Sequence, residues 1–241
     1  MTSDTPDPGD FCRQVEAYLC RKNDGHLIRI AGPAFEQVCG WAARGIPLAL
    51  VTRGIDRYFD RYYAKGPRRR PVRVEFCEAD VLDVFDEWRR SVGVSAVEPS
   101  AGNASEADAE SGSRASGSLP AHLDRVIARL TTLRGGLDRS FDALLDATVR
   151  ELDTMRARAK SARGDHRDEL IERLRGLDAV LVNAVRNACA ADTLRQLDQQ
   201  ADEELRPFRT RLSPEAYQQA RGLCVERLLR DRARLPVLTY A

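Results

Sequence analysis

The sequence predicts an all-α protein with a small helical N-terminal domain, a disordered linker and a C-terminal three-helix bundle or long antiparallel helical hairpin. Apolar residues recur at three- and four-residue spacing through most of the chain, as they do in helices that bury one face. Over residues 94–119 the composition changes to Ser, Gly, Ala, Glu and Asp, which bury too little surface to offset the entropy of ordering. The expected parts are a disordered tail (1–9), a small helical domain (10–93), a flexible linker (94–119) and the bundle or hairpin domain (120–241).

The first two helices of the N-terminal domain are predicted from their ends. Asp10 can cap a helix over residues 11–22 by accepting a hydrogen bond from a free amide of the first turn. Pro33 suits the first turn of a second helix, because its ring pre-sets φ and its missing N–H would have no partner there. Gly45 closes this second helix, since glycine adopts the positive φ of a helix end at little cost.

Two further helices and a short strand are expected to complete this domain. Alternating apolar and charged residues over 72–76 predict the strand. A last helix follows, with Glu78 and Asp80 near its positive N-terminus. The helix before the strand begins after Pro47, and its expected apolar stripe consists of Leu48, Val51, Ile55, Tyr58, Phe59 and Tyr62.

In the C-terminal domain the helical period persists for tens of residues. Two apolar stripes, over 123–155 and 170–205, are separated by Gly164 and Asp165, a helix stop followed by a cap. The two arms are therefore expected to fold back on each other as an antiparallel hairpin. Gly135 with Gly136, and Asp192 with Thr193, are places where either arm could break. A third helix that closes the bundle is predicted at Ser213, Pro214 and Glu215.

Composition and charge exclude several classes of protein. The net charge is only +1, so any attraction to nucleic acid or to anionic lipid must be local. The longest apolar run, over 46–51, is far shorter than the roughly 20 residues of a membrane span, which predicts no membrane partner. The chain starts without the basic and apolar segments of a signal peptide. These features predict a soluble, cytoplasmic protein of bacterial type.

No pattern for catalysis, a cofactor or a metal is found in the sequence. Its six cysteines lack the spacing of zinc or redox pairs, and its three histidines lack the spacing of a metal site. There is no glycine-rich phosphate loop and no nucleophile motif. The expectation is a non-catalytic protein without cofactor or metal, whose cysteines are buried small apolar residues. An enzyme whose site assembles from distant residues would leave no such pattern and stays open.

One stretch carries positive charge that is not balanced locally. Three arginines recur every four residues along the third helix, and the basic turn, defined as residues 65–71, continues the charge. Guanidinium groups bind phosphate in bidentate geometry, and such binding releases counterions. Tyr62 and Tyr63 can add stacking on unpaired bases. The predicted nucleic-acid-binding residues are Arg53, Arg57, Arg61, Lys65, Arg68, Arg69, Arg70 and Arg73.

A structural explanation of the same stretch stays open beside this one. Asp56 and Asp60 can neutralise the arginines of the helix, and the tyrosines can pack in the core. Arginine is abundant and lysine nearly absent throughout the chain, which also fits a coding bias. The basic turn has no local counter-charge, so the prediction of phosphate binding depends mainly on the turn.

A short stretch around Trp41, Gly45 and Ile46, preceded by the apolar Val38, resembles the helix end of DnaD-type domains of bacterial replication initiation proteins. The resemblance implies that the segment after Ile46 contacts DNA. It departs from the family pattern because Val38 and Cys39 lie one residue too close to Trp41. No wing-bearing domain precedes the stretch in this sequence.

The C-terminal domain supports an alternative function. A helical hairpin with an apolar seam is a common scaffold for a homo-oligomer or for a bound partner helix. The last residues of the chain are apolar and extended, and they either cover the bundle or act as a docking peptide. The alternative is therefore a protein-binding adaptor or scaffold, with partner-binding residues Leu235, Val237, Leu238 and Tyr240.

Overall fold

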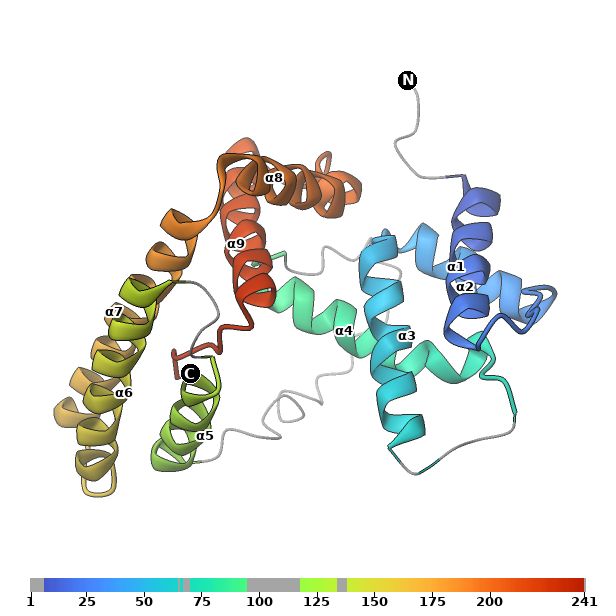
Figure 1. Cartoon of the computed structure of the whole chain (residues 1–241). Coiled ribbons are helices and arrows are strands. Elements are labelled where there is room, and N and C mark those ends of the chain that lie inside the picture. The colour runs from blue at the N-terminus through green and yellow to red at the C-terminus, as the bar shows by residue number, and fades with distance from the viewer. Residues whose placement is uncertain (1–6, 65, 67–69, 95–117, 134–137, 241) are drawn as a thin grey trace. The chain divides into compact units, whose positions relative to one another are not determined.

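A computed structural model describes residues 7–64, 66, 70–94, 118–133 and 138–240 (Figure 1). All regular structure in these residues is helical, which confirms the predicted all-α class. The chain divides into two compact units, which do not follow the expected domain order. Unit 1 comprises residues 1–98 and 198–224, and unit 2 comprises residues 99–197 and 225–241. Most of the predicted tail and linker lies outside the described residues.

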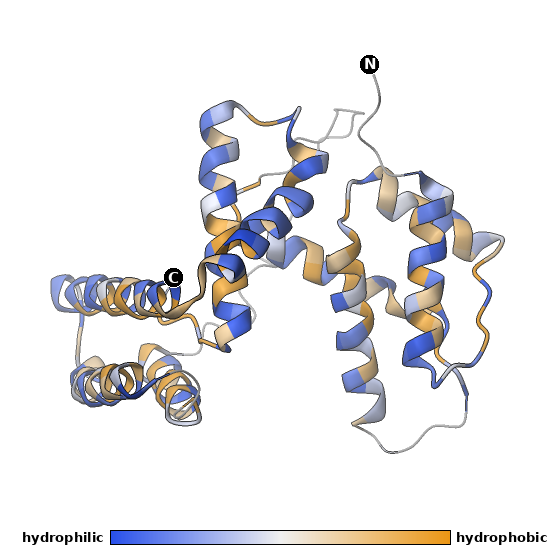
Figure 2. Cartoon of the chain, turned by 45° about the horizontal axis from the view of Figure 1, so that its top comes forward, coloured by the Kyte–Doolittle hydropathy of each residue, from blue (hydrophilic) through white to orange (hydrophobic). Residues whose placement is uncertain are grey.

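Unit 1 is built around helix α3. Its elements are α1 (Pro8–Lys22), α2 (Pro33–Ala43), α3 (Leu48–Tyr63), the 3₁₀ turn η1 (Val74–Cys77), α4 (Glu78–Ser91), the end of α8 (Ala191–Leu205), the 3₁₀ turn η2 (Arg206–Phe208) and the first part of α9 (Pro214–Ala233). Helix α3 packs against α1 and α4, and α1 packs against α2. The helices mix hydrophilic and hydrophobic residues along their length, as expected for amphipathic helices (Figure 2).

The predicted start of α1 was wrong, and its cap lies three residues earlier. The helix begins at Pro8, and the side chain of Asp7 accepts a hydrogen bond of 3.0 Å from the backbone N of Asp10. Pro8 fits the first helical position, which lets Asp7 take the capping place that the sequence assigned to Asp10.

The end of α2 follows the prediction from Gly45. This glycine has φ +75°, its N–H bonds to the carbonyl of Ala42, and the N–H of Ile46 bonds to the carbonyl of Trp41, each at 3.0 Å. Together these bonds form a Schellman motif. Trp41 and Ile46 are both buried, so the Trp-Gly-Ile step has a packing role in this protein.

The predicted strand over 72–76 was wrong. Residues Val74–Cys77 form η1, and α4 starts directly afterwards at Glu78. The backbone of Val72 pairs with the side chain of Asn23 instead of another strand. Val72 and Val74 are buried, as the alternation predicts, but Phe76 is 59% exposed, because the 3₁₀ turn does not keep the two-residue period of a strand.

Helices α3 and α4 cross at a glycine. A Cβ added to Gly54 would lie 2.5 Å from the Cα of Val81 on α4, closer than real Cβ contacts come. The buried side of α3 consists of Leu50, Val51, Gly54, Ile55 and Phe59. Leu48, Tyr58 and Tyr62 are only half-buried, so the expected apolar stripe was wrong at these three positions.

Replacing Gly54 by alanine should force α3 and α4 apart. We expect Gly54→Ala to lower the free energy of unfolding by about 1–3 kcal/mol, measured by urea denaturation, despite the higher helix propensity of alanine. Gly40→Ala on α2 is the matched control, because no atom lies within 4 Å of its added Cβ. It should raise stability by about 0.5–1 kcal/mol. Equal effects of the two changes would contradict the close crossing.

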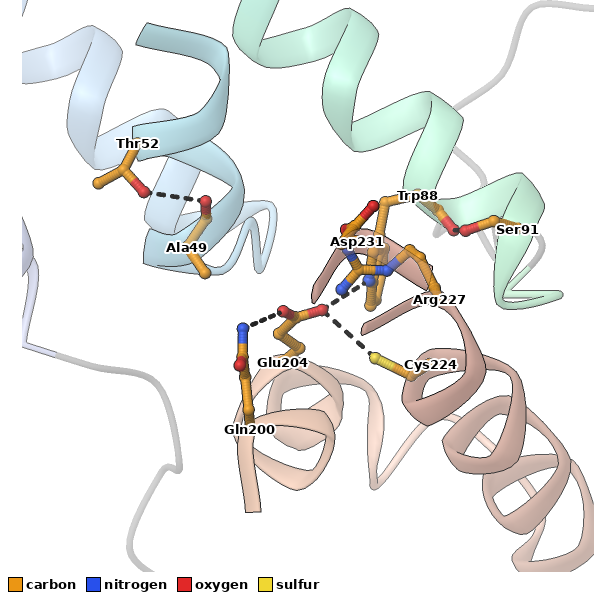
Figure 3. A network of polar contacts seen from close by, with 9 residues as sticks. All are labelled: Ala49, Thr52, Trp88, Ser91, Gln200, Glu204, Cys224, Arg227 and Asp231. Carbon is orange, nitrogen blue, oxygen red and sulfur yellow. Dashed lines mark hydrogen bonds and ion pairs between the residues drawn. The ribbon is translucent and has the colours of Figure 1, made fainter. Parts of the chain in front are cut away.

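A buried carboxylate fixes residues 198–224 within unit 1 (Figure 3). Glu204, 3% exposed, accepts hydrogen bonds from the indole N–H of Trp88 at 2.9 Å and from the thiol of Cys224 at 3.3 Å. The ring of Phe208 lies 5.4 Å from Trp88 and 6.2 Å from Phe85, between centroids. The expected boundary at residue 93 misses this packing because its partners are more than 100 residues apart in sequence.

Glu204→Ala should destabilise unit 1 strongly, because it leaves two buried donors without their acceptor. We expect a loss of about 2–4 kcal/mol in the free energy of unfolding, followed by tryptophan fluorescence in urea. Glu203→Ala removes the neighbouring exposed carboxylate and should stay within about 0.5 kcal/mol of the wild type. A Glu204→Ala protein as stable as this control would refute a structural role for the buried carboxylate.

Unit 2 contains the predicted antiparallel hairpin, with both arms broken. Its helices are α5 (Leu119–Thr131), α6 (Arg139–Ala159) and α7 (Asp165–Ala188), followed by the start of α8 and the end of α9. Helix α6 packs against α5 and α7. The first arm breaks between α5 and α6, around the predicted glycines, which lie outside the described residues. The second breaks at Cys189, just before Asp192, and the helix predicted at Ser213 begins at Pro214.

The end of the chain packs inside unit 2. Arg230 forms a bidentate pair with the buried Asp178, with one bond of 2.9 Å, and the backbone N of Leu238 donates to the same carboxylate at 2.8 Å. A ring nitrogen of His122 lies 3.0 Å from the carbonyl oxygen of Leu238. These contacts join α5, α7, α9 and the tail.

Candidate nucleic-acid interface

The basic turn joins the end of α3 to η1, and both of its ends are fixed. At its start the N–H of Gly66 bonds to the carbonyl of Tyr63 at 2.9 Å. Beyond its end the backbone N–H of Val72 donates to Oδ1 of Asn23 at 2.6 Å, and Nδ2 of Asn23 donates to the Val72 carbonyl at 3.1 Å. The short connection is thereby anchored to α1 as well as α3.

Asn23 is a positioning residue that the sequence did not reveal. It lies just past α1 and is 2% exposed, and its Nδ2 also donates to the carbonyl of Leu19 at 2.8 Å. The sequence identified Asn23 only as part of a helix-ending cluster. Its pairing with Val72 spans 49 residues, so no local pattern could have shown it.

Two of the predicted phosphate-binding arginines are engaged by α4. Arg57 bonds to Glu87 at 2.8 Å, which raises the pKa of its guanidinium, and lies 3.8 Å from the buried Asp80. Arg61 bonds to Asp80 at 2.6 Å. Arg57 and Arg61 are thus compensated by acidic residues of α4.

Asp56 contacts α1 and not the arginines of its own helix. Nζ of Lys22 lies 2.8 Å from its carboxylate, and the hydroxyl of Tyr18 donates to it at 2.7 Å. Burial and this hydrogen bond raise the pKa of Tyr18 to about 12. Asp56 therefore links α1 to α3, and the expected pairing of Asp56 with the arginines of α3 was wrong.

Of the remaining predicted residues, Arg53 lies on α3, and the others belong to the basic turn or follow it. Lys65, Arg68 and Arg69 lie outside the described residues. Arg53 and Arg70 are exposed, and Arg73 pairs with Glu75 at 2.7 Å while most of its side chain stays in solvent.

The cysteine of η1 is not a nucleophile. Burial and the nearby Asp80 carboxylate raise the pKa of Cys77 to about 12, so its thiol stays protonated at neutral pH.

The predicted partner-binding tail is mostly part of the fold. Leu235 and Leu238 are buried, and Tyr240 packs against the ring of His122 at 5.4 Å between centroids. Of the four predicted residues only Val237 is well exposed, at 53%. The structure therefore places Leu235 and Leu238 in the core of unit 2, where they cannot dock a partner without leaving it.

The part of the chain that the structure describes offers no metal site and no membrane span. No group of three or more His, Cys, Asp or Glu side chains there is arranged to hold a metal ion. No helix among the same residues combines the length and apolarity of a membrane span. None of the six cysteines forms a disulfide, and Cys12, Cys77 and Cys224 are buried while the other three are half-buried. No protein-family model, curated protein or solved structure matches this chain.

Removing the Asn23 amide should release the end of the turn. Asn23→Ala leaves both polar backbone groups of the buried Val72 without these partners, so we expect a loss of about 2–4 kcal/mol in unfolding free energy. Hydrogen exchange at the Val72 amide should accelerate. Asp24→Gly changes the neighbouring residue, which has φ +56°, and should stay within about 0.5 kcal/mol of the wild type. Unchanged exchange at Val72 in the alanine variant would contradict the anchoring.

Proposed function

We propose that this protein is a non-catalytic accessory protein that binds nucleic acid through phosphate contacts of the basic turn. The observation that carries the proposal is the charge of residues 65–73, which include five basic and no acidic residues. The protein as a whole has a net charge of only +1, so this positive charge is local. Binding of phosphates there would release condensed counterions, the main source of affinity in non-specific nucleic-acid binding.

The contacts of α3 narrow the proposed interface. Arg57 and Arg61 already have carboxylate partners on α4, and a phosphate would have to compete with them. Arg70 is exposed on the far side of the turn, close to the Asn23 anchor at Val72. An anchored turn loses less conformational entropy on binding than a free one, which favours phosphate contacts.

The resemblance to DnaD-type domains agrees with this proposal. In that family the segment after the Trp-Gly-Ile step is implicated in DNA contact, and in this chain the same segment is α3 followed by the basic turn. Nucleic acid in the cytoplasm of a bacterium is accordingly the proposed partner. The adaptor alternative has less support, since Leu235 and Leu238 of its docking peptide are buried in unit 2.

The proposal predicts that the affinity for nucleic acid falls strongly with salt, and that the arginines of the basic turn cause most of this fall. With the full-length protein and a fluorescently labelled oligonucleotide, affinity should fall steeply as salt rises. The triple change Arg68→Ala, Arg69→Ala and Arg70→Ala should weaken binding and reduce the slope of log K against log salt by about 2–3, since each phosphate contact adds nearly one unit.

A charge-matched control distinguishes the effect of the turn's arginines on binding from the effect of the protein's net charge. Arg139, Arg158 and Arg163 are exposed arginines of unit 2, and changing all three to alanine alters the net charge equally. This control should bind with the wild-type slope. Binding that is unchanged in the variant of the turn, or equally weakened in both triple variants, would reject the assignment.

A further inference from the structure

Aromatic rings and cations contact one another in a continuous strip around the last turns of α3. Successive members lie 5.4–5.8 Å apart, measured between ring centroids or from a cation to a ring centroid. We call this set the aromatic strip, and in order of contact it consists of Lys22, Phe59, Tyr63, Tyr62, Tyr58 and Arg61.

The tyrosines of the strip are ordered without being part of the core. Phe59 is buried and supports Tyr63, whose ring lies 5.8 Å away. Tyr63 is 39% exposed, and Tyr58 and Tyr62 are half-exposed. Tyr62 stacks on Tyr58 with an interplanar angle of 21° and meets the Tyr63 ring edge-on at 88°. Mutual packing therefore restricts these rings while leaving part of their surface in solvent.

The two cations of the strip fix its ends. Lys22 is paired with Asp56, and Arg61 with Asp80, so each cation is held by a carboxylate while it lies over a ring. Their charges are largely compensated by these partners. Positive charge for a ligand must come from the chain that follows the strip.

The chain that follows α3 packs against the same helix again. The turn leaves α3 directly after Tyr63, and η1 packs back against α3. Arg73 immediately precedes η1, and Arg70 lies two residues before the anchored Val72. The exposed rings at the end of α3 are therefore followed, within ten residues of chain, by the exposed guanidinium groups of Arg70 and Arg73.

We infer that this end of α3 binds single-stranded nucleic acid, with unpaired bases stacked on Tyr62 and Tyr63 and the phosphates on Arg70 and Arg73. The inference rests on the proposed function and names its ligand class. A duplex keeps its bases stacked inside and offers phosphates alone to a ring-bearing surface, whereas a single strand offers both groups at once. Every base has a π-face, so this mode of binding tolerates any sequence.

The test compares a labelled 20-nucleotide oligo(dT) with a 20-base-pair duplex on the full-length protein at one salt concentration. The oligo(dT) should bind about tenfold more tightly or better. The double change Tyr62→Leu and Tyr63→Leu should weaken oligo(dT) binding about tenfold, with duplex binding unchanged.

Two control variants accompany this change. Tyr62→Phe with Tyr63→Phe keeps the rings and should bind oligo(dT) with the wild-type affinity. Phe35→Leu on α2 removes an equally exposed ring outside the strip, 40% exposed, and should have no effect.

The possible outcomes separate the inference from the proposal beneath it. Equal affinity for both oligonucleotides, or oligo(dT) binding that the leucine variant leaves intact, overturns the inference while phosphate binding stands. Binding to neither oligonucleotide rejects the proposed function itself.

A competition experiment tests whether a free nucleotide is the ligand. If thymidine monophosphate displaces oligo(dT) at micromolar concentration, the ligand is a free nucleotide and the inference is overturned. Loss of binding in both the phenylalanine and the leucine variants would assign the tyrosines a structural role and also overturn it.

Discussion

The close crossing of α3 and α4 at Gly54 is the constraint on which unit 1 depends. Because Gly54 has no Cβ, the backbone of α4 at Val81 reaches α3 directly. This approach brings Asp80 and Glu87 of α4 within reach of Arg57 and Arg61. A helix that looks strongly basic in sequence is thus compensated by its neighbour. One packing contact accordingly decides which cations remain available to a ligand.

The chain that follows the basic turn is fixed by a different contact. The Asn23 side chain bonds to both the N–H and the carbonyl of Val72, so the residue after the turn is fixed to the end of α1. Arg70, two residues before this anchor, is exposed. Arg73 also remains largely exposed despite its pair with Glu75.

Much of the fold could be predicted because helix signals are local. Pro33, Gly45 and Pro214 act within one turn of the helices that they start or end, and all three predictions agree with the structure. Two wrong predictions, the cap of α1 and the strand over 72–76, also rested on local patterns. Asp10 and Asp7 are both good caps, and only the position of Pro8 favoured Asp7. The strand over 72–76 failed because alternation gives no information about whether a partner strand exists.

By itself the sequence determined the helical class, the positions of most helices and the concentration of positive charge after α3. These properties follow from the period of apolar residues, from capping chemistry and from counting charges. The tertiary structure alone decided that residues 198–224 belong to unit 1, that α4 neutralises α3, and that the tyrosines form a part-exposed strip. Each of these depends on contacts between residues far apart in the chain, and a contact of that kind leaves no periodic trace in a single sequence.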